Sequence, residues 1–499
     1  MRKSETPTSL LTSASHPSGG EDGEVPLCPA ETPRVGEVPQ TAAASYAIGQ
    51  LLRIAGWPEG LTSRAAAAIY YGSDASKGQR AAVWVQPNCA AGAALVECLL
   101  GSTAEATIRQ ANGVAVSAGQ GSRLAGDVIA ATASCLTLAG ERRAVCRDPH
   151  GRLPADAGPL PPRERLERPP LHDYAELLAA RLRGCGLLPE PLPRWPGGKR
   201  YAAALTHDVD APEVPRRVGV LLKQMLLGGP RPRRHPYWDL LAEIRARGLG
   251  QGCLFPPTRR REWNFEEICV MEDRHGLRSA FYFAVVNRAA GHACDVSYDA
   301  SRLRYRRLCR RLLSGGWEIG LHAAYATCED RPPVEYQARR FAQLFGDRPA
   351  GLRHHYLRMA ADDPLRTLAA DADAGFSYDT TVGFNDQPGF RMGVALPVEV
   401  FDPRRGGGGG LIELPMTLAD MHLPKDDIPA AVEAVTRHLQ TVRSLGGLAV
   451  LNWHVGAWAT APAWRESYAA ACRILSEDSD VWVATPREIA DWWRQRAAR

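Results

Sequence analysis

The 499-residue chain lacks the marks of several protein classes. Its twelve cysteines show no C-x-x-C spacing, which excludes a zinc knuckle or redox motif and indicates reduced, mostly buried thiols. No apolar run reaches the roughly 18 residues that a membrane span requires, and no sustained apolar stretch precedes Gly19 to mark a secretory signal. The net charge of +5 is small for this length and does not indicate nucleic-acid binding. We therefore expect a cytoplasmic protein with no membrane span and no nucleic-acid partner.

Length and composition predict four segments. Residues 1–40 are rich in Ser, Thr, Pro, Gly and Glu and cannot bury enough apolar surface to become ordered, so a disordered tail is expected. Residues 41–165 mix helical and strand patterns, as in a small α/β domain. Residues 166–200 hold an amphipathic helix at 173–187 and a proline-rich linker. In residues 201–499 strands alternate with helices, which predicts a parallel sheet, either a barrel or a doubly wound layer.

The apolar periodicity also predicts individual elements. The strands expected in the second half are 202–206, 279–286, 318–321, 351–353, 411–414, 448–452 and 481–485. The helices expected there are 302–314, 333–345, 429–444 and 464–477. The first half is expected to hold helices at 46–55, 90–100 and 124–138 and a strand at 81–85. The glycine run 406–410 is expected to be a flexible loop tip, because no Lys-Ser/Thr pair follows it as in a phosphate-binding loop.

Ionisable residues follow several of the expected strands at the point where each strand ends. The first strand finishes in THDVD (206–210), although burying unpaired charge is costly and core strands rarely end in such a cluster. Other strands finish in His322, in RHHY (353–356), in Asp379 and in His454. A single strand-end histidine is more often structural, hydrogen-bonded to a carbonyl or carboxylate. Since the carboxyl ends of parallel strands meet on one face of a barrel, we expect a metal or acid–base site there.

The types of side chain in this set suit one reaction chemistry. Carboxylate and imidazole ligands bind divalent metals, and catalytic zinc takes three protein ligands and an open water position. Such a metal lowers the pKa of its water to about 7 and polarises a carbonyl, as hydrolysis of an amide or ester requires. A second carboxylate can take the proton of the water, an arginine can keep that carboxylate ionised, and a histidine can protonate the leaving amine.

The ordered motifs resemble those of a known family. THDVD (206–210), EIGLH (318–322), RHHY (353–356) and LNWH (451–454) follow the motif order of the polysaccharide deacetylase family, the NodB-homology or carbohydrate esterase family 4 superfamily. The resemblance covers roughly 201–493 and is to a branch with a THDVD first motif and a small N-terminal domain. Further stretches that resemble this branch are 351–359, 375–384, 389–393 and 413–415, and the N-terminal domain is matched at 125–155 and 168–182.

The resemblance implies a fold, a reaction and a cofactor. The fold is a distorted (β/α) barrel of the NodB-homology type, preceded by a small α/β domain. The reaction is the removal of an acetyl group from an N-acetylated or O-acetylated sugar, in polysaccharide or cell-envelope glycan biosynthesis. The cofactor is one divalent metal, zinc first, with cobalt or nickel as alternatives. The partner is a carbohydrate substrate, and the oligomeric state is left open.

The first two motifs imply a base and metal ligands. Asp208 aligns with the general base of the family, and Asp210 is the nearest carboxylate available as a metal ligand because Val209 occupies the adjacent position. The roles of the two aspartates could be exchanged. His322 matches the first histidine ligand of the second motif, but Ala326 stands where the second histidine should be. Alanine cannot bind a metal, so another residue or a water must take its place, or metal binding is lost.

The later motifs imply the remaining roles. His355, where the family usually has proline, is the first candidate to replace the missing ligand, with His207 and His354 as weaker ones. Arg353 matches the arginine that orients the base. His454 matches the histidine that acts as general acid or stabilises the oxyanion.

Three assignments depend on less specific patterns. Asp379 most resembles the carboxylate that orients His454, and Asp420 competes because it is nearer in sequence. Tyr356 and Trp453 are expected to contact the substrate, although large aromatic side chains more often lie in the core. Two alternative functions stay open: a catalytically impaired deacetylase fold that binds carbohydrate, and a metal hydrolase of a non-sugar amide.

Overall fold

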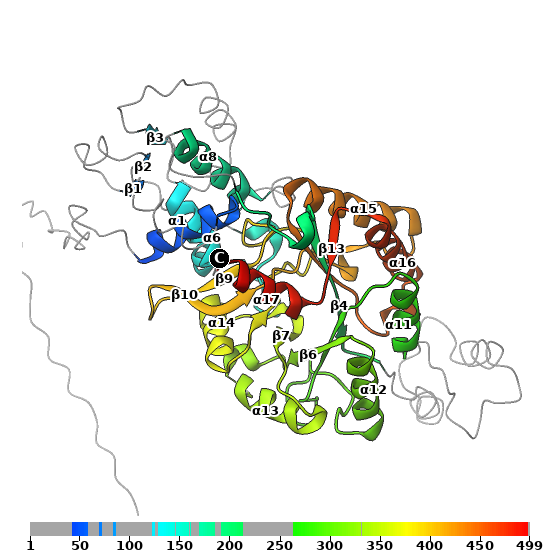
Figure 1. The fold of residues 1–499 in the computed structure, drawn as a ribbon. Helices are drawn as coiled ribbons and strands as arrows, with labels where there is room; N and C mark the ends of the chain where they lie inside the picture. Colours follow the sequence, from blue (N-terminus) through cyan, green and yellow to red (C-terminus); the bar gives the residue numbers. More distant parts are fainter. Residues whose placement is uncertain are drawn as a thin grey trace, which may run out of the picture.

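The computed structural model describes residues 42–57, 69–71, 83–85, 122–124, 128–144, 146–158, 160, 169–184, 191–212, 263–330 and 332–497. The tail expected at 1–40 and the helix expected at 90–100 lie outside these residues. Figure 1 shows the described elements along the chain.

A curled, mostly parallel sheet forms the centre of the second half (Figure 1). Its strand order is β11-β12-β4-β5-β6-β7-β8-β10-β9, and β13 also pairs with β4. The strands are β4 (Tyr201–Val209), β5 (Ala280–Phe283), β6 (Glu318–Ala323), β7 (Gly351–His354), β8 (Tyr378–Asp379), β9 (Val398–Asp402), β10 (Gly407–Glu413), β11 (Leu418–Ala419), β12 (Leu448–Asn452) and β13 (Val481–Val483). Only β9 and β10 pair in antiparallel fashion among these strands. The predicted parallel sheet is confirmed, and its curl fits a distorted barrel.

The short segment between β10 and β11 connects the β8 side of the sheet to the β12 side. Leu414 donates from its backbone N–H to the carbonyl of Asp379 in β8 at 2.8 Å, and Thr417 donates to the carbonyl of Val450 in β12 at 3.0 Å. The chain therefore leaves the β8 side as β10 and joins β12 as β11. This crossing brings the loop after β11 next to the end of β12.

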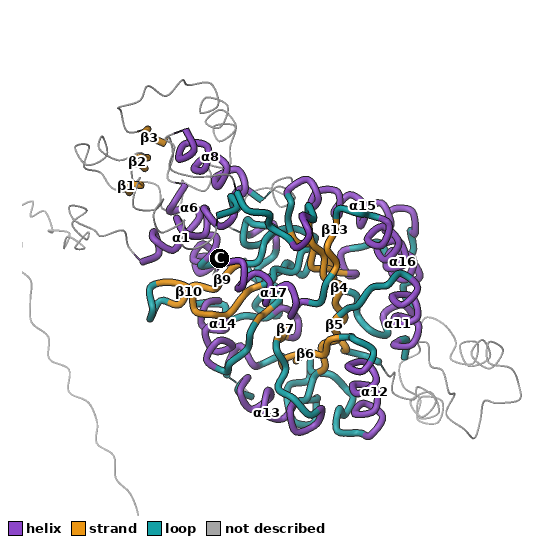
Figure 2. The backbone as a smooth tube through the Cα atoms, viewed as in Figure 1, coloured by secondary structure: helices purple, strands orange, loops and turns teal. Residues whose placement is uncertain are grey.

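Helices surround the sheet (Figure 2). They are α11 (Phe265–Arg274), α12 (Leu303–Ser314), α13 (Val334–Phe345), α14 (Pro364–Asp373), α15 (Ile428–Leu445), α16 (Pro462–Glu477) and α17 (Pro486–Ala497). Helix α12 shows why they form: Tyr305, Leu308 and Leu312 recur at helical spacing and are buried, while the intervening arginines are exposed. The helices predicted at α12, α13, α15 and α16 are confirmed.

Short 3-10 turns complete the connections. They are η1 (Ala139–Arg143), η2 (Ala155–Ala157), η3 (Pro196–Gly198), η4 (Thr327–Glu329), η5 (His355–Leu357), η6 (Asp420–His422) and η7 (Ala457–Ala459).

The C-terminal helix α17 lies across the amino ends of the strands (Figure 1). The backbone N–H of Arg487 donates to Glu318, the first residue of β6, at 3.0 Å. Arg494 donates to the carbonyl of Ser377, just before β8. This end of the sheet is therefore covered, and the carboxyl ends of the strands are left for a site.

The glycine run is a hairpin and not the expected flexible tip. Gly406 has φ of +64° and makes the turn, but 407–410 begin strand β10, and Gly407 and Gly408 pair with Asp402 and Phe401 of β9. A Cβ on Gly408 would lie 2.2 Å from the carboxyl group of Glu399, so a larger residue there would displace that side chain. The expectation was wrong because the partner strand β9 was not recognised from the sequence.

The described N-terminal residues form helices α1 (Ala42–Ile54), α6 (Val128–Leu136) and α8 (Pro170–Gly184) and a parallel sheet of β1 (Ile69–Tyr71), β2 (Val83–Val85) and β3 (Ser122–Leu124). Helices α1 and α6 pack directly on this hairpin. Tyr46 donates to the carbonyl of Glu399 at 2.7 Å, and Arg53 pairs with the Glu399 carboxylate at 2.8 Å. A buried pair joins Arg391 to Glu141 at 2.6 Å. The three helices share one hydrophobic core with the barrel, so the boundary near residue 165 stays a prediction.

Among the described residues, none of the helices is both long and apolar enough to cross a membrane.

Two tyrosines fill the interior of the sheet at positions where the neighbouring strand has glycine. Tyr282 lies opposite Gly320, and Tyr378 lies opposite Gly351. The two phenolic oxygens are 3.1 Å apart. A Cβ on Gly351 would fall 2.0 Å from the Tyr378 ring, so this layer excludes any larger residue.

We expect Gly351→Ala to lower the free energy of unfolding by about 1–3 kcal/mol or more, because the added methyl collides with a fully buried ring. Gly49→Ala in α1 is the matched control: a Cβ there meets open space, and the change should stabilise by up to about 1 kcal/mol. Urea unfolding of both variants measures the two effects, and equal effects would contradict the interior layer.

Candidate active site

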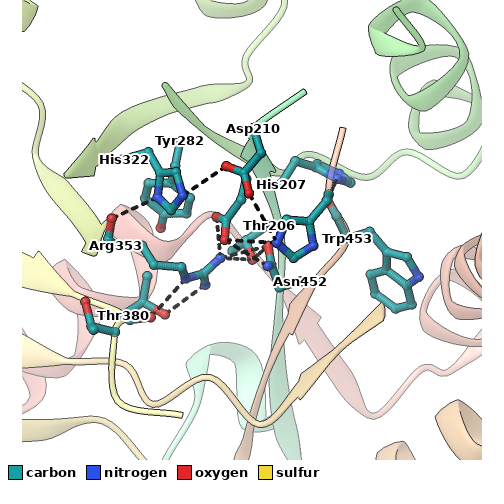
Figure 3. A network of polar contacts seen from close by, with 12 residues as sticks. Thr206, His207, Asp210, Tyr282, His322, Arg353, Thr380, Asn452 and Trp453 are labelled. Carbon is teal, nitrogen blue, oxygen red and sulfur yellow. Dashed lines mark hydrogen bonds and ion pairs between the residues drawn. The ribbon is translucent and has the colours of Figure 1, made fainter. Parts of the chain in front are cut away.

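The carboxyl ends of four strands bring the predicted site residues together. Asp208 and Asp210 come from the end of β4, His322 from β6, Arg353 and His355 from the end of β7, and His454 follows β12. Figure 3 shows Asp210, His322, Arg353 and Asn452 pointing toward one centre. The convergence expected from the strand-end pattern is therefore present.

These side chains open into a cavity of about 350 Å³, a size within the range of small-molecule sites. Its lining residues are Arg152, Asp208, Asp210, Ala211, Arg288, Cys294, Asp295, Val296, His322, His355, Tyr356, Leu357, Asn385, Met416, Ala419, Met421, Asn452 and His454.

Asp210, His322 and His355 form a cluster whose ligand atoms lie within 4.8 Å of one another. Asp210 Oδ1 is 3.1 Å from His322 Nε2, and Asp210 Oδ2 is 3.5 Å from His355 Nε2. The other ring nitrogen of His322, Nδ1, lies 2.9 Å from the carbonyl oxygen of Arg353. Because a carbonyl only accepts, Nδ1 carries the proton in the neutral ring, and a lone pair at Nε2 faces the carboxylate.

This arrangement fits a divalent cation. His322 Nε2 and Asp210 Oδ1 are both buried and neither has a hydrogen bond of good geometry. Two buried acceptors facing each other repel unless a proton or a cation lies between them. A carboxylate and two imidazoles are ligands that zinc and similar metals accept. The donor set therefore matches the metal that the sequence resemblance implies.

In space, His355 offers a donor atom that Ala326 does not. Ala326 precedes the turn η4 and carries no ligand atom. His355, one residue after β7, supplies the third donor of the cluster. This is the position that the sequence named first as a replacement.

Asp295 is a site residue that the sequence reasoning missed. Its Oδ1 lies 3.8 Å from His355 Nδ1 and accepts from the backbone N–H of Tyr325 at 2.7 Å. Burial alone would raise its pKa, but the nearby His355 ring and hydrogen bonds from the backbone N–H groups of Tyr325 and His292 hold the pKa of Asp295 below its usual value. An ionised carboxylate behind a ligand histidine fixes the orientation of the ring. The residue lies in a loop with no strand pattern, so no sequence signal pointed to it.

Asp208 is held by a buried arginine. Arg353 Nη1 donates to Asp208 Oδ1 at 2.9 Å, and Asn452 Nδ2 donates to Asp208 Oδ2 at 3.0 Å. Burial opposes ionisation of Asp208, but Arg353 and then His322 and His454 hold the pKa of Asp208 below its usual value. Asp208 thus faces the arginine and Asp210 faces the histidine ligands, which separates two carboxylates that the sequence could not tell apart.

His454 is oriented by Asp420 and not by Asp379. His454 Nδ1 lies 2.8 Å from Asp420 Oδ1, and its backbone N–H donates to Asp420 Oδ2 at 2.8 Å. Asp379 instead accepts from the backbone N–H and the hydroxyl of Thr381. The topology explains the correction: Asp420 follows β11, which pairs with β12 beside His454, whereas Asp379 ends β8 between β7 and β10.

The free nitrogen of His454 faces the two carboxylates. His454 Nε2 is 3.9 Å from Asp208 Oδ2 and 3.8 Å from Asp210 Oδ2. Burial lowers the pKa of His454, but Asp420 and then Asp210 and Asp208 raise it to about 10. The ring can therefore hold a proton at the cavity, beside the two carboxylates.

The two weaker ligand candidates lie outside the cavity. His207 Nδ1 is 2.9 Å from the carbonyl of Trp453, and its Nε2 contacts Glu272 and Tyr468 in the core. His354 Nε2 is 3.0 Å from Asp371. Neither ring joins Asp210, so neither replaces the missing ligand.

Of the two aromatic residues expected to contact the substrate, one lines the cavity and the other lies in the core. Tyr356 lines the cavity, with φ of +62°, a left-handed conformation that is uncommon for a residue with a side chain and typical of functional loops. Trp453 is fully buried, and its Nε1 donates to Ser467 Oγ at 3.2 Å. The expectation that Trp453 contacts substrate was wrong, because the side chain after β12 turns into the core.

Part of the cavity wall comes from the N-terminal half of the chain. Arg152 donates to the carbonyl of Tyr356 at 3.2 Å and to Asn385. Behind this wall, the ring of His150 packs 4.6 Å from that of Tyr356, and its Nδ1 lies 2.9 Å from the hydroxyl of Tyr325. The sequence reasoning missed these residues because they are far from every strand end.

No family model matches the chain, and no curated protein matches it. Among solved structures, one described as a polysaccharide deacetylase from Mycobacterium smegmatis is 20% identical, with a TM-score of 0.40 over 62% of this chain and 95% of that chain. An allantoinase named Puue is 17% identical, with a TM-score of 0.39 over 62% of this chain and 94% of that chain. One described as a polysaccharide deacetylase from Pseudomonas aeruginosa PAO1 is 17% identical, with a TM-score of 0.36 over 61% of this chain and 95% of that chain. These likenesses are distant, and the function proposed below rests on the site.

We expect His322→Ala and His355→Ala each to weaken zinc binding by more than about 100-fold, because loss of a ligand exceeds the loss seen for residues behind a ligand. Titration of metal-free protein with zinc, followed by calorimetry, measures this. His275→Ala is the control: its ring bonds Ser476 away from the cavity. Unchanged affinity in His355→Ala would show that His355 does not replace the missing ligand.

Proposed function

We propose that the chain is a divalent-metal-dependent hydrolase that removes an acetyl group from an N-acetylated or O-acetylated sugar. The observation that carries the proposal is the meeting of three arrangements in one cavity. They are the ligand cluster around Asp210, the base held by Arg353, and the histidine held by Asp420.

Asp210, His322 and His355 would hold the metal. When bound, a divalent cation in such a site lowers the pKa of water toward about 7 and polarises the acyl carbonyl. The cluster leaves Asp208 and His454 outside the ligand set, so both stay available for proton transfer.

Asp208 is the proposed general base. Arg353 and Asn452 each donate to one of its oxygens, which keeps it ionised and fixes its orientation. Each oxygen retains a further lone pair that can accept the proton of the attacking water. The fixed geometry favours transfer without rearrangement of the side chain.

His454 is the proposed general acid. Asp420 fixes Nδ1, so Nε2 faces the cavity and can deliver a proton to the departing amine or alcohol. The proton taken by the base and the proton given to the leaving group then pass through different side chains, Asp208 and His454.

The impaired-enzyme alternative is less favoured by the site than hydrolysis, because His355 supplies a third donor despite Ala326. A non-sugar amide would meet the same catalytic groups, so a panel of acetylated sugars and linear or cyclic amides must separate the two substrate classes by acetate or ammonia release.

We expect Asp208→Asn to lower kcat for acetate release by about 10²–10⁴-fold, the usual contribution of a general base, while bound zinc stays at the wild-type level. Acetate release and metal content are measured on the same preparation. Loss of the metal in Asp208→Asn would show that the roles of Asp208 and Asp210 are exchanged.

We expect Asp420→Asn to lower kcat by about tenfold or more, because the ring of His454 loses the carboxylate that orients it and stabilises its charged form. KM and bound zinc should stay close to wild type, since Asp420 belongs to neither the ligand cluster nor the cavity lining. A wild-type kcat in this variant would contradict the proposed role of His454 as general acid.

A further inference from the structure

Among the residues that the structure describes, one arginine at the cavity has no acidic partner. Arg288 lies in the loop after β5, is exposed, and lines the cavity. Its Nε donates to the carbonyl of Asp295 at 2.7 Å, and its backbone N–H donates to the carbonyl of Val296 at 3.0 Å. Within the part of the chain that the structure describes, no carboxylate pairs with its guanidinium. Both Nη groups are therefore left for another acceptor.

The second arginine of the cavity is already neutralised. Arg152 Nε and Nη2 each lie 2.6 Å from the carboxylate of Asp148. Its Nη1 donates to the carbonyl of Tyr356 and to Asn385, and its guanidinium stacks 5.4 Å from the centre of the Tyr356 ring. Arg152 thus builds the wall behind Tyr356, and Arg288 is the cation with free donors.

Both arginines share the cavity with Tyr356. Arg152 stacks on the Tyr356 ring, and Arg288 and Tyr356 line the same cavity. An aromatic ring that lines a cavity beside a free guanidinium offers a sugar an apolar face and a charged contact together.

Asp295 links Arg288 to the ligand cluster. Its carbonyl holds Arg288 Nε, while its side chain backs His355 in the ligand cluster. A guanidinium anchored through Nε presents its remaining N–H groups as a planar fork, which matches the oxygens of a phosphoryl or carboxylate group. A neutral sugar would need no such charge in the cavity.

We propose that the substrate of this site is an acetylated sugar that also carries an anionic group, a phosphoryl or a carboxylate, and that Arg288 binds that group. The proposal rests on the acetyl hydrolase function above and narrows its substrate class. Tyr356 contacts the sugar between the anion and the acetyl group.

Equilibrium binding to zinc-loaded Asp208→Asn protein tests this, because that variant should leave the substrate intact. The probes are N-acetylglucosamine, N-acetylglucosamine 1-phosphate and N-acetylglucosaminuronic acid. At least one anionic sugar should bind about tenfold or more tightly than the neutral one, as expected for a charge-assisted contact. Adding Arg288→Gln should remove that difference, and Arg288→Lys should restore part of it.

Arg307→Gln is the matched control, because Arg307 is an exposed arginine on α12 outside the cavity lining. It should leave all three affinities unchanged. The anionic sugar that loses affinity in Arg288→Gln identifies the group as phosphoryl or carboxylate. Equal affinities for the three sugars, or a preference that survives Arg288→Gln, would overturn the proposal.

The two proposals fail in different ways. If wild-type protein releases no acetate from any sugar but Arg288 still governs anion binding, the acetyl hydrolase function is wrong and the anion contact stands. If acetate is released and Arg288→Gln changes no KM, the function stands and the anion contact is wrong.

Discussion

The buried contact between Arg353 and Asp208 is the interaction on which the site depends. Arg353 is completely buried, and its guanidinium donates to Asp208, Thr206, Asn452 and the backbone and hydroxyl of Thr380. A buried charge that loses its partner costs about 3–5 kcal/mol. Since these partners come from β4, β12 and the end of β8, the strands can meet only in the register that satisfies the guanidinium. That register also sets where the two aspartates and the histidines reach the cavity.

The same principle holds each imidazole of the site. A carbonyl fixes His322, Asp420 fixes His454 and Asp295 backs His355, so in each ring the nitrogen away from the reacting centre is engaged and the other faces the cavity. Groups behind a ligand determine its tautomer and orientation. The site is thus built from pairs, and each pair joins a strand end to a loop or a neighbouring strand.

Site residues at strand ends could be predicted from the sequence, and site residues in loops could not. Asp208, His322, Arg353 and His454 were found because an apolar run that stops at an ionisable residue is visible in the sequence. Asp295, Arg288 and Arg152 lie in segments without periodicity, and a polar loop residue has no local signal that separates a site residue from a solvated one. The choice of Asp379 over Asp420 failed for a related reason, because it depended on which strands are neighbours.

The sequence by itself determined the set of chemical groups, the parallel order of strands and helices, and the alanine at position 326 where the motif it resembles has histidine. Only the tertiary structure decided that His355 completes the ligand cluster, that Asp420 orients His454, and that an N-terminal segment forms part of the cavity wall. The physical reason is that hydrophobic periodicity records which face of an element is buried. Which residues meet across elements is set by strand pairing and by the need to satisfy buried charge, and neither is written in local spacing.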